Sequence, residues 1–169
     1  MSKTIAILYK TKYILCQKAL YLLYCSLIVP YMTYCVEVWG NACKTNTNPI
    51  FLLQKKAIRI INRADYCEPT NKLFIKCNTL KFHDIVIQKT VLVAFKAQQK
   101  SLPPNIQALF QIKENQYELR GKSMFQMETA GTNIKKRSAL YRAKEIWNDC
   151  QNKVKMCNSA DKFKKTLKI

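Results

Sequence analysis

Basic residues recur at helical spacing in one segment of the chain, and binding of phosphate groups is the chemistry that they could do. The segment reads Leu53-Gln-Lys-Lys-Ala-Ile-Arg-Ile-Ile61. In a helix, one buried face would carry Ile50, Leu53, Ala57, Ile60 and Ile61, whereas Gln54 would lie on the opposite face with the cations. The cations are Lys55, Lys56, Arg59 and Arg63. We expect them to contact nucleic-acid phosphates, and a helix face that only contacts solvent is the alternative.

A second basic patch is expected in the last third of the chain. It consists of Lys135, Lys136, Arg137 and Arg142. Arg120 is a further candidate for phosphate contact, and Tyr117 is a candidate for stacking on a base. The sequence has 29 Lys and Arg against 10 Asp and Glu, a net charge of +19 that is spread over both ends. Such self-repulsion favours a polyanionic partner, either nucleic acid or an anionic membrane.

The sequence predicts no catalytic site and no metal site. Two-metal nucleotidyl transfer needs clustered carboxylates, but the acidic residues are scattered and no Asp-Asp pair occurs. The eight cysteines form no Cys-x-x-Cys pair, and His83 has no Cys or His near it in the sequence, so the ligand spacing of a zinc site is missing. The cysteines are Cys16, Cys25, Cys35, Cys43, Cys67, Cys77, Cys150 and Cys157. We expect neither enzyme activity nor a cofactor, and reduced cysteines in an intracellular protein, nuclear or cytoplasmic.

The composition favours a mainly α fold, an irregular helical bundle, because only 3 Gly and 5 Pro are available for turns. A short β-hairpin around residues 117–134 is the one strand element that the pattern allows. We expect a single domain over residues 1–169. Within it, helices would occupy residues 1–64, a helical middle part residues 65–115, and a basic C-terminal part residues 116–169.

Hydrophobic periodicity and proline positions predict the first helices. One helix is expected to begin within residues 1–18 and to run into Leu20–Val29, and Pro30 must kink or restart it. Beyond Pro30, one face of a further helix is expected to carry Tyr31, Tyr34, Cys35 and Val38. Asn48 and Pro49 would begin the helix that carries the first basic patch.

Further helices are expected over residues 72–77, 80–100 and 138–150, and another after Ser159. The uncharged run from Ala19 to Val36 approaches the length of a membrane span. Its four tyrosines and its central proline suit a helix buried in protein better. We therefore expect no membrane span.

An ordered set of short motifs covers most of the chain. The first are Ser2-Lys3-x-Ile5-x-Ile7-Leu8-x-Lys10, Leu22-x-Tyr24-x-Ser26-Leu27-Ile28-x-Pro30-Tyr31-x-x-Tyr34-Cys35-x-x-Val38-Trp39-Gly40 and Leu53-Gln54-Lys55-Lys56-Ala57-Ile58-Arg59-Ile60-Ile61. The later ones are Leu73-Phe74, Leu80-Lys81, Leu102-Pro103, Tyr117-x-x-Arg120, Ser138-x-x-Tyr141, Trp147-Asn148 and Ser159-x-x-x-Phe163-Lys164-Lys165. In order and spacing this set resembles the region after the palm in reverse transcriptases of LINE-type (non-LTR) retrotransposons.

The resemblance implies a thumb and connection segment, whose helices grip template RNA and primer beside a polymerase site. RNA or an RNA/DNA hybrid is then the expected partner, and the polymerase palm or another protein a further one. The catalytic aspartates of that family lie upstream of the region that this chain resembles. Ala143-Lys144 and Cys150-Gln151 replace the Gly-Pro and Leu-Pro of the family pattern, and Glu68-Pro69-Thr70 stands where the family has His-Thr. These departures suggest a truncated copy that has drifted.

Three functions remain open from the sequence. The leading hypothesis is a non-catalytic nucleic-acid-binding fragment of a reverse transcriptase. The second is a structural or protein-interaction module whose apolar segment Leu20–Trp39 packs against a polymerase palm. The third is a basic protein that associates with membranes through Ala19–Val36.

Overall fold

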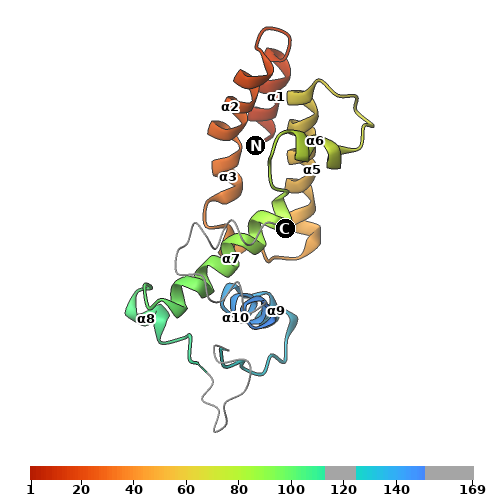
Figure 1. Cartoon of the computed structure of the whole chain (residues 1–169). Helices are drawn as coiled ribbons and strands as arrows, with labels where there is room; N and C mark the ends of the chain where they lie inside the picture. The colour runs from red at the N-terminus through yellow and green to blue at the C-terminus, as the bar shows by residue number, and fades with distance from the viewer. Residues whose placement is uncertain (113–124, 151–169) are drawn as a thin grey trace. The chain divides into compact units, whose positions relative to one another are not determined.

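The computed structural model of the chain describes residues 1–112 and 125–150 (Figure 1). The regular elements in this part of the chain are helices, which confirms the predicted mainly α fold. Contacts divide the chain into two compact units. The first comprises Met1–Val36 and Ala42–Ile85, and the second comprises Glu37–Asn41 and Val86–Ile169. That the chain folds as a single domain stays a prediction.

Two helices, and not the one that we expected, form the N-terminal region. α1 spans Ser2–Thr11 and α2 spans Gln17–Leu27, and they pack against each other and against α5 in the first unit (Figure 1). α1 buries Ile5 and Leu8, and α2 buries Leu20 and Tyr24. A turn between the two helices lets both apolar faces meet one core, which a continuous helix would prevent.

A stripe of fully buried residues at every fourth position defines the inner face of the long apolar run. The residues are Leu20, Tyr24, Ile28, Met32 and Val36. The stripe continues past Pro30, although α2 ends at Leu27 and α3 (Val29–Thr33) begins just before that proline. Because Pro30 has no N–H to donate, the helix has to restart there, and this prediction is confirmed.

The prediction that one continuous helix face follows Pro30 is wrong. Tyr34 has an extended backbone and Cys35 has a positive φ of 46°. The helical conformation is therefore interrupted between α3 and α4 (Val36–Trp39). Tyr31, Tyr34 and Val38 are exposed, whereas Met32 and Val36 are buried. α4 then ends directly before Gly40, and glycine is a common residue just beyond the end of a helix.

α5 spans Lys44–Asn62 and begins earlier than we expected. Pro49 lies inside this helix, so it is not the first residue of the helix as predicted. The additional first turn buries Thr47, whose hydroxyl donates to the carbonyl of Cys43 (3.4 Å). At the other end, Arg63 closes the helix with a left-handed backbone (φ 53°), and its N–H bonds to the carbonyl groups of Arg59 and Ile60.

The side chain of Gln54 is fully buried, contrary to its predicted place on the basic face. Its Nε2 donates to the hydroxyl of Tyr24 on α2 (3.1 Å) and to the carbonyl of Leu80 (2.9 Å). Its Oε1 accepts from the N–H of Phe82, the first residue of α7 (2.7 Å). The first N–H groups of a helix have no partner within it, so Gln54 caps α7 from another helix.

α6 (Thr70–Lys76) completes the first unit and packs on α5. The ring of Phe51 lies 6.4 Å from the ring of Phe74 and 5.0 Å from that of His83. His83 is therefore an aromatic neighbour in this unit. The predicted helix over residues 72–77 is confirmed with a slightly earlier start.

The second unit contains most of α7 (Phe82–Gln98), together with α8 (Pro104–Gln107), α9 (Asn133–Arg137) and α10 (Ala139–Asp149). Its core comprises Val91, Ala94, Phe95, Ala97, Phe110, Phe125, Ala143 and Trp147. The ring of Phe125 lies between those of Phe110 (5.1 Å) and Trp147 (6.2 Å). α7 and α10 match the predicted helices over residues 80–100 and 138–150, and Ser138 caps α10 by accepting from the N–H of Tyr141 (3.4 Å).

The predicted hairpin is reduced, within the described residues, to a single antiparallel bridge between Ile112 and Phe125. Residues 117–124 of that prediction lie outside the described residues, and residues 133–134 belong to α9 and not to a strand. The side chain of Asn148 binds the Phe125 backbone twice, accepting from its N–H (2.9 Å) and donating to its carbonyl (3.0 Å). These bonds replace those that a neighbouring strand would make.

Among residues 1–112 and 125–150, no helix is long and apolar enough to cross a bilayer. The uncharged run that we considered for a span is divided between α2 and α3. The helix expected after Ser159 lies outside the described residues.

We predict that Gln54→Leu destabilises the protein by about 2–4 kcal/mol, although leucine is apolar and of similar size. It would leave the buried N–H of Phe82 and the buried hydroxyl of Tyr24 without this partner, and each buried group so left costs roughly 1–3 kcal/mol, whereas the carbonyl of Leu80 is only half-buried and costs less. Urea denaturation measures the change. Leu52→Ala, at an exposed position of the same helix, is the control and should change the free energy of unfolding by about 0.5 kcal/mol or less. A Gln54→Leu variant as stable as the wild type would contradict the role of this carboxamide.

Candidate nucleic-acid interface

Three of the four cations predicted on α5 meet at one hollow of the first unit. Lys56, Arg59 and Arg63 line this hollow, which has a volume of about 480 Å³. Lys55 is not part of its lining, and the Lys55 ammonium lies 4.4 Å from the ring centre of Phe51. The basic face of α5 is thus divided, and the three converging residues form the candidate site.

Backbone hydrogen bonds hold two of these side chains in place. Arg59 donates through Nε to the carbonyl of Glu68 (3.0 Å), and Arg63 donates through Nη2 to the carbonyl of Leu15 (3.2 Å). A guanidinium has five N–H groups, and each of these bonds uses one. The chain therefore orients both guanidinium groups and leaves donors that could bind an anion.

Helix α1, the turn after it and the connector after α5 add residues that the sequence analysis missed. Lys12 lines the same hollow with Tyr9, Tyr13 and Tyr66, and we call this set with the three α5 cations the cationic hollow. The Lys12 ammonium lies 4.3 Å from the ring centre of Tyr9 and 4.6 Å from that of Tyr13. Such cation–π contacts hold an ammonium in place without neutralising its charge. Asp65 also lines the hollow.

A signal for part of this set is present in the sequence. Tyr9 and Lys12 are three residues apart, so they would be neighbours on one helix face. No local pattern places Tyr66 there, because it lies in the connector after α5. Only the packing of α1 against α5 brings these segments together.

In the second unit, acidic residues pair with half of the predicted basic patch. Lys135 binds Glu128 (2.9 Å), and Arg142 binds Glu145 one turn away on α10. Lys136 and Arg137 are exposed and have no carboxylate partner among the described residues. They remain candidates for phosphate contact, whereas Arg120 and Tyr117 lie outside the described residues.

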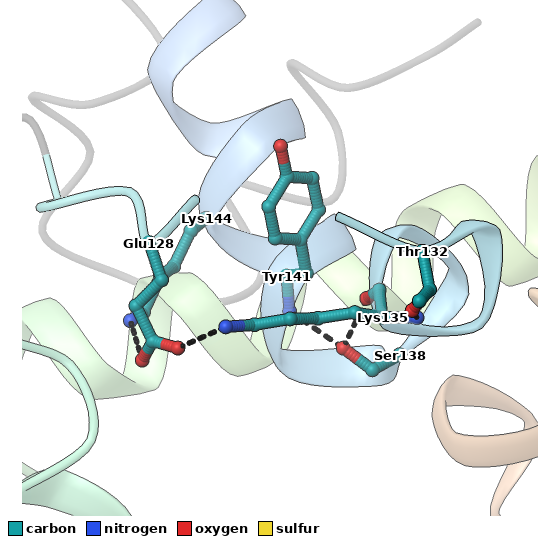
Figure 2. Close-up of polar contacts among 6 residues, drawn as sticks. All are labelled: Glu128, Thr132, Lys135, Ser138, Tyr141 and Lys144. Carbon is teal, nitrogen blue, oxygen red and sulfur yellow. Dashed lines mark hydrogen bonds and ion pairs between the residues drawn. The ribbon is translucent and has the colours of Figure 1, made fainter. Parts of the chain in front are cut away.

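Lys144 is a buried cation that the sequence analysis did not predict. Figure 2 shows the Glu128 carboxylate between the ammonium groups of Lys135 and Lys144, the second at 4.0 Å. Burial lowers the pKa of the Lys144 ammonium. The hydrogen bond from Lys135 lowers the pKa of the Glu128 carboxyl, and the charge of Lys144 acts in the same direction. Thr132 and Ser138 cap α9 and α10 and so fix the positions of both lysines (Figure 2).

Within the described ranges, no group of three or more His, Cys, Asp and Glu side chains could hold a metal ion. No disulfide joins two of the cysteines in the part of the chain that the structure describes. The arrangement that these residues offer is a set of cations and tyrosines, which can bind an anion and an aromatic group.

Comparison with known proteins identifies no relative. No protein-family model matches the chain, no curated protein matches it, and no solved structure matches it.

We predict that the stability of the protein falls on acidification partly through Glu128. A carboxyl whose pKa is lowered in the folded state contributes stability above its ordinary pKa of 4.5, and this contribution is lost as the pH falls through the lowered value. Glu128→Gln should therefore lower the stability at pH 7 and flatten its dependence on pH below about pH 5. Urea denaturation at several pH values measures both effects. Asp149→Asn, at an exposed position of α10 outside the ion pairs of the described residues, controls for the change in net charge, and equal pH profiles for wild type and Glu128→Gln would contradict the role of this ion pair.

Proposed function

We propose that this chain is a non-catalytic nucleic-acid-binding module that grips the phosphate backbone at the cationic hollow. The observation that carries the proposal is the convergence of Lys12, Lys56, Arg59 and Arg63 on one hollow. Lys12 lies directly after α1, Lys56 and Arg59 lie on α5, and Arg63 lies directly after α5. Helical periodicity of α5 alone would not bring them together.

Electrostatics supports an anionic partner for this site. Like charges that line one hollow repel one another, and the protein as a whole carries +19. A polyanion removes this repulsion and releases its own counterions on binding, so that affinity falls steeply with salt. Orientation of Arg59 and Arg63 by backbone carbonyl groups reduces the entropy that binding has to overcome.

The resemblance to the post-palm region of LINE-type reverse transcriptases extends the proposal. A thumb segment grips RNA or an RNA/DNA hybrid next to a polymerase, so we propose RNA or such a hybrid as the preferred ligand. The polymerase palm would then be a protein partner. Residence in the nucleus or the cytoplasm, where such templates occur, belongs to the same proposal. The chemistry of polymerisation would come from the palm and not from this chain.

We predict that the triple variant Lys56→Ala, Arg59→Ala and Arg63→Ala binds RNA more weakly and with less dependence on salt. Loss of three phosphate contacts should reduce the slope of log K against log salt concentration by roughly 2–3 units. Fluorescence anisotropy with labelled structured RNA, an RNA/DNA hybrid and duplex DNA over a salt series measures this slope.

The matched control removes the same charge elsewhere. Lys44→Ala, Lys72→Ala and Lys96→Ala change three exposed lysines that do not line the cationic hollow. This variant should keep most of the salt slope. Equal slopes for both triple variants would mean that only net charge matters, and salt-insensitive binding by the wild type would contradict the proposed function.

A second candidate function is that of a protein-interaction module, and exposed apolar side chains on α2 and α3 favour it. Leu22 and Tyr31 are 68% and 64% exposed, and Leu27 lies exposed between them in the sequence. In an intact polymerase such a face could pack against the palm. We expect the wild type to self-associate through this face and the variant Leu22→Ser with Tyr31→Ser to be monomeric at the same concentration, as measured by sedimentation velocity at high salt. A monomeric wild type would count against this function.

A further inference from the structure

A second hollow adjoins the cationic hollow and differs from it in chemistry. It has a volume of about 560 Å³ and shares Tyr9, Lys56 and Tyr66 with the first. Its other lining residues are Ser2, Ile5, Ala6, Lys10 and Leu53. We call it the apolar hollow because aliphatic side chains and tyrosines form most of its wall. The shared residues stand where the two hollows meet.

We infer that the two hollows together bind one unpaired nucleotide of a single-stranded nucleic acid, with its phosphate in the cationic hollow and its base at the tyrosines that border the apolar hollow. This inference rests on the proposed function and specifies its ligand. A nucleotide has an anion at one end and a flat, largely apolar ring at the other, so it matches both hollows at once. A duplex backbone matches the cationic hollow alone, because its bases stay stacked inside the helix.

The aromatic residues decide between these ligands. Tyr13 and Tyr66 are 79% and 83% exposed. Phosphate contact requires no aromatic ring, whereas a base gains affinity by stacking on one, whatever its sequence. The cations next to these rings supply the positively charged track that accompanies such stacking in single-strand binding.

The roles of the tyrosines differ. The rings of Tyr9 and Tyr13 hold the Lys12 ammonium, so that this cation is available to a phosphate. Tyr66 lines both hollows, and it is the residue that we assign to base stacking. Asp65 next to it can only accept hydrogen bonds when it is ionised, so it can bind sugar hydroxyl or base N–H groups but repels phosphate.

The experiment compares three labelled ligands by fluorescence anisotropy at one salt concentration. They are a short oligothymidylate, an abasic strand of the same length and a DNA duplex of the same length. The abasic strand keeps the phosphates and lacks the bases. We expect the tightest binding for the oligothymidylate. Tyr66→Ala should weaken that binding about 5- to 150-fold, the range for loss of one stacked base, and should leave binding of the abasic strand unchanged.

Two variants control for the role of Tyr66. Tyr66→Phe keeps the ring and should retain the affinity for oligothymidylate. Tyr31→Ala removes an exposed tyrosine that lines neither hollow and should have no effect. Because Tyr66 is exposed, its replacement should leave the fold intact, and far-UV circular dichroism checks this.

The outcomes separate the inference from the proposed function. If all three ligands bind with equal affinity and steep salt dependence, and if Tyr66→Ala changes nothing, the inference is overturned while the proposed function stands. If none of the three ligands binds in a salt-dependent way, the inference is overturned, and if labelled structured RNA and the RNA/DNA hybrid also fail to bind, the proposed function is overturned with it. Binding to phosphatidylserine vesicles without binding to oligothymidylate would assign the hollows to a lipid headgroup and would also overturn the inference.

Discussion

The hydrogen bonds of the Gln54 carboxamide determine how the first unit is assembled. They join α5 to the Tyr24 hydroxyl on α2 and to the first N–H of α7. A buried carboxamide with three specific partners permits only one rotation of α5 about its axis. In that rotation Ile58 and Ile61 are buried next to it, and Lys56 and Arg63 are exposed. The cationic hollow thus depends on a neutral polar contact inside the core.

Carboxamides have a similar role in the second unit. Asn148 binds the backbone of Phe125 in both directions, and Gln107 donates to the carbonyl of Ala97 near the end of α7 (2.8 Å). A neutral amide can satisfy both N–H and carbonyl groups, and it does not require burial of a charge. The Glu128 carboxylate is the contrasting case, because it lies between two lysines, one of them buried, and its ion pairs offset part of the charge that surrounds it.

The sequence predicted the type and the approximate bounds of the main helices, since their periodicity and their stop signals are local. It predicted the restart at Pro30 for the same reason, whereas the cap that Ser138 provides for α10 was not predicted. It could not predict which side of the run from Leu20 to Val36 is buried, because nearly every residue there is apolar. The sequence analysis placed Gln54 on the exposed face of α5, because a polar residue among lysines is usually exposed. Its burial follows from hydrogen bonds to groups that are distant in the sequence. Three cations of the hollow were predicted by their spacing, but Tyr66 was not, because it reaches the site through tertiary packing.

The backbone of Arg63 has a consequence for the balance between stability and function. A left-handed residue at the end of a helix is most often glycine, and for other residues this conformation costs about 1–2 kcal/mol. The chain has only three glycines in all, and here it has an arginine at φ 53°. A glycine at this position would relieve the strain, but it would remove a guanidinium from the cationic hollow. Cys35, Asn78 and Lys100 have a positive φ as well, but of these four residues only Arg63 lines the cationic hollow, so the proposed site takes one of its cations from a position whose backbone conformation costs stability.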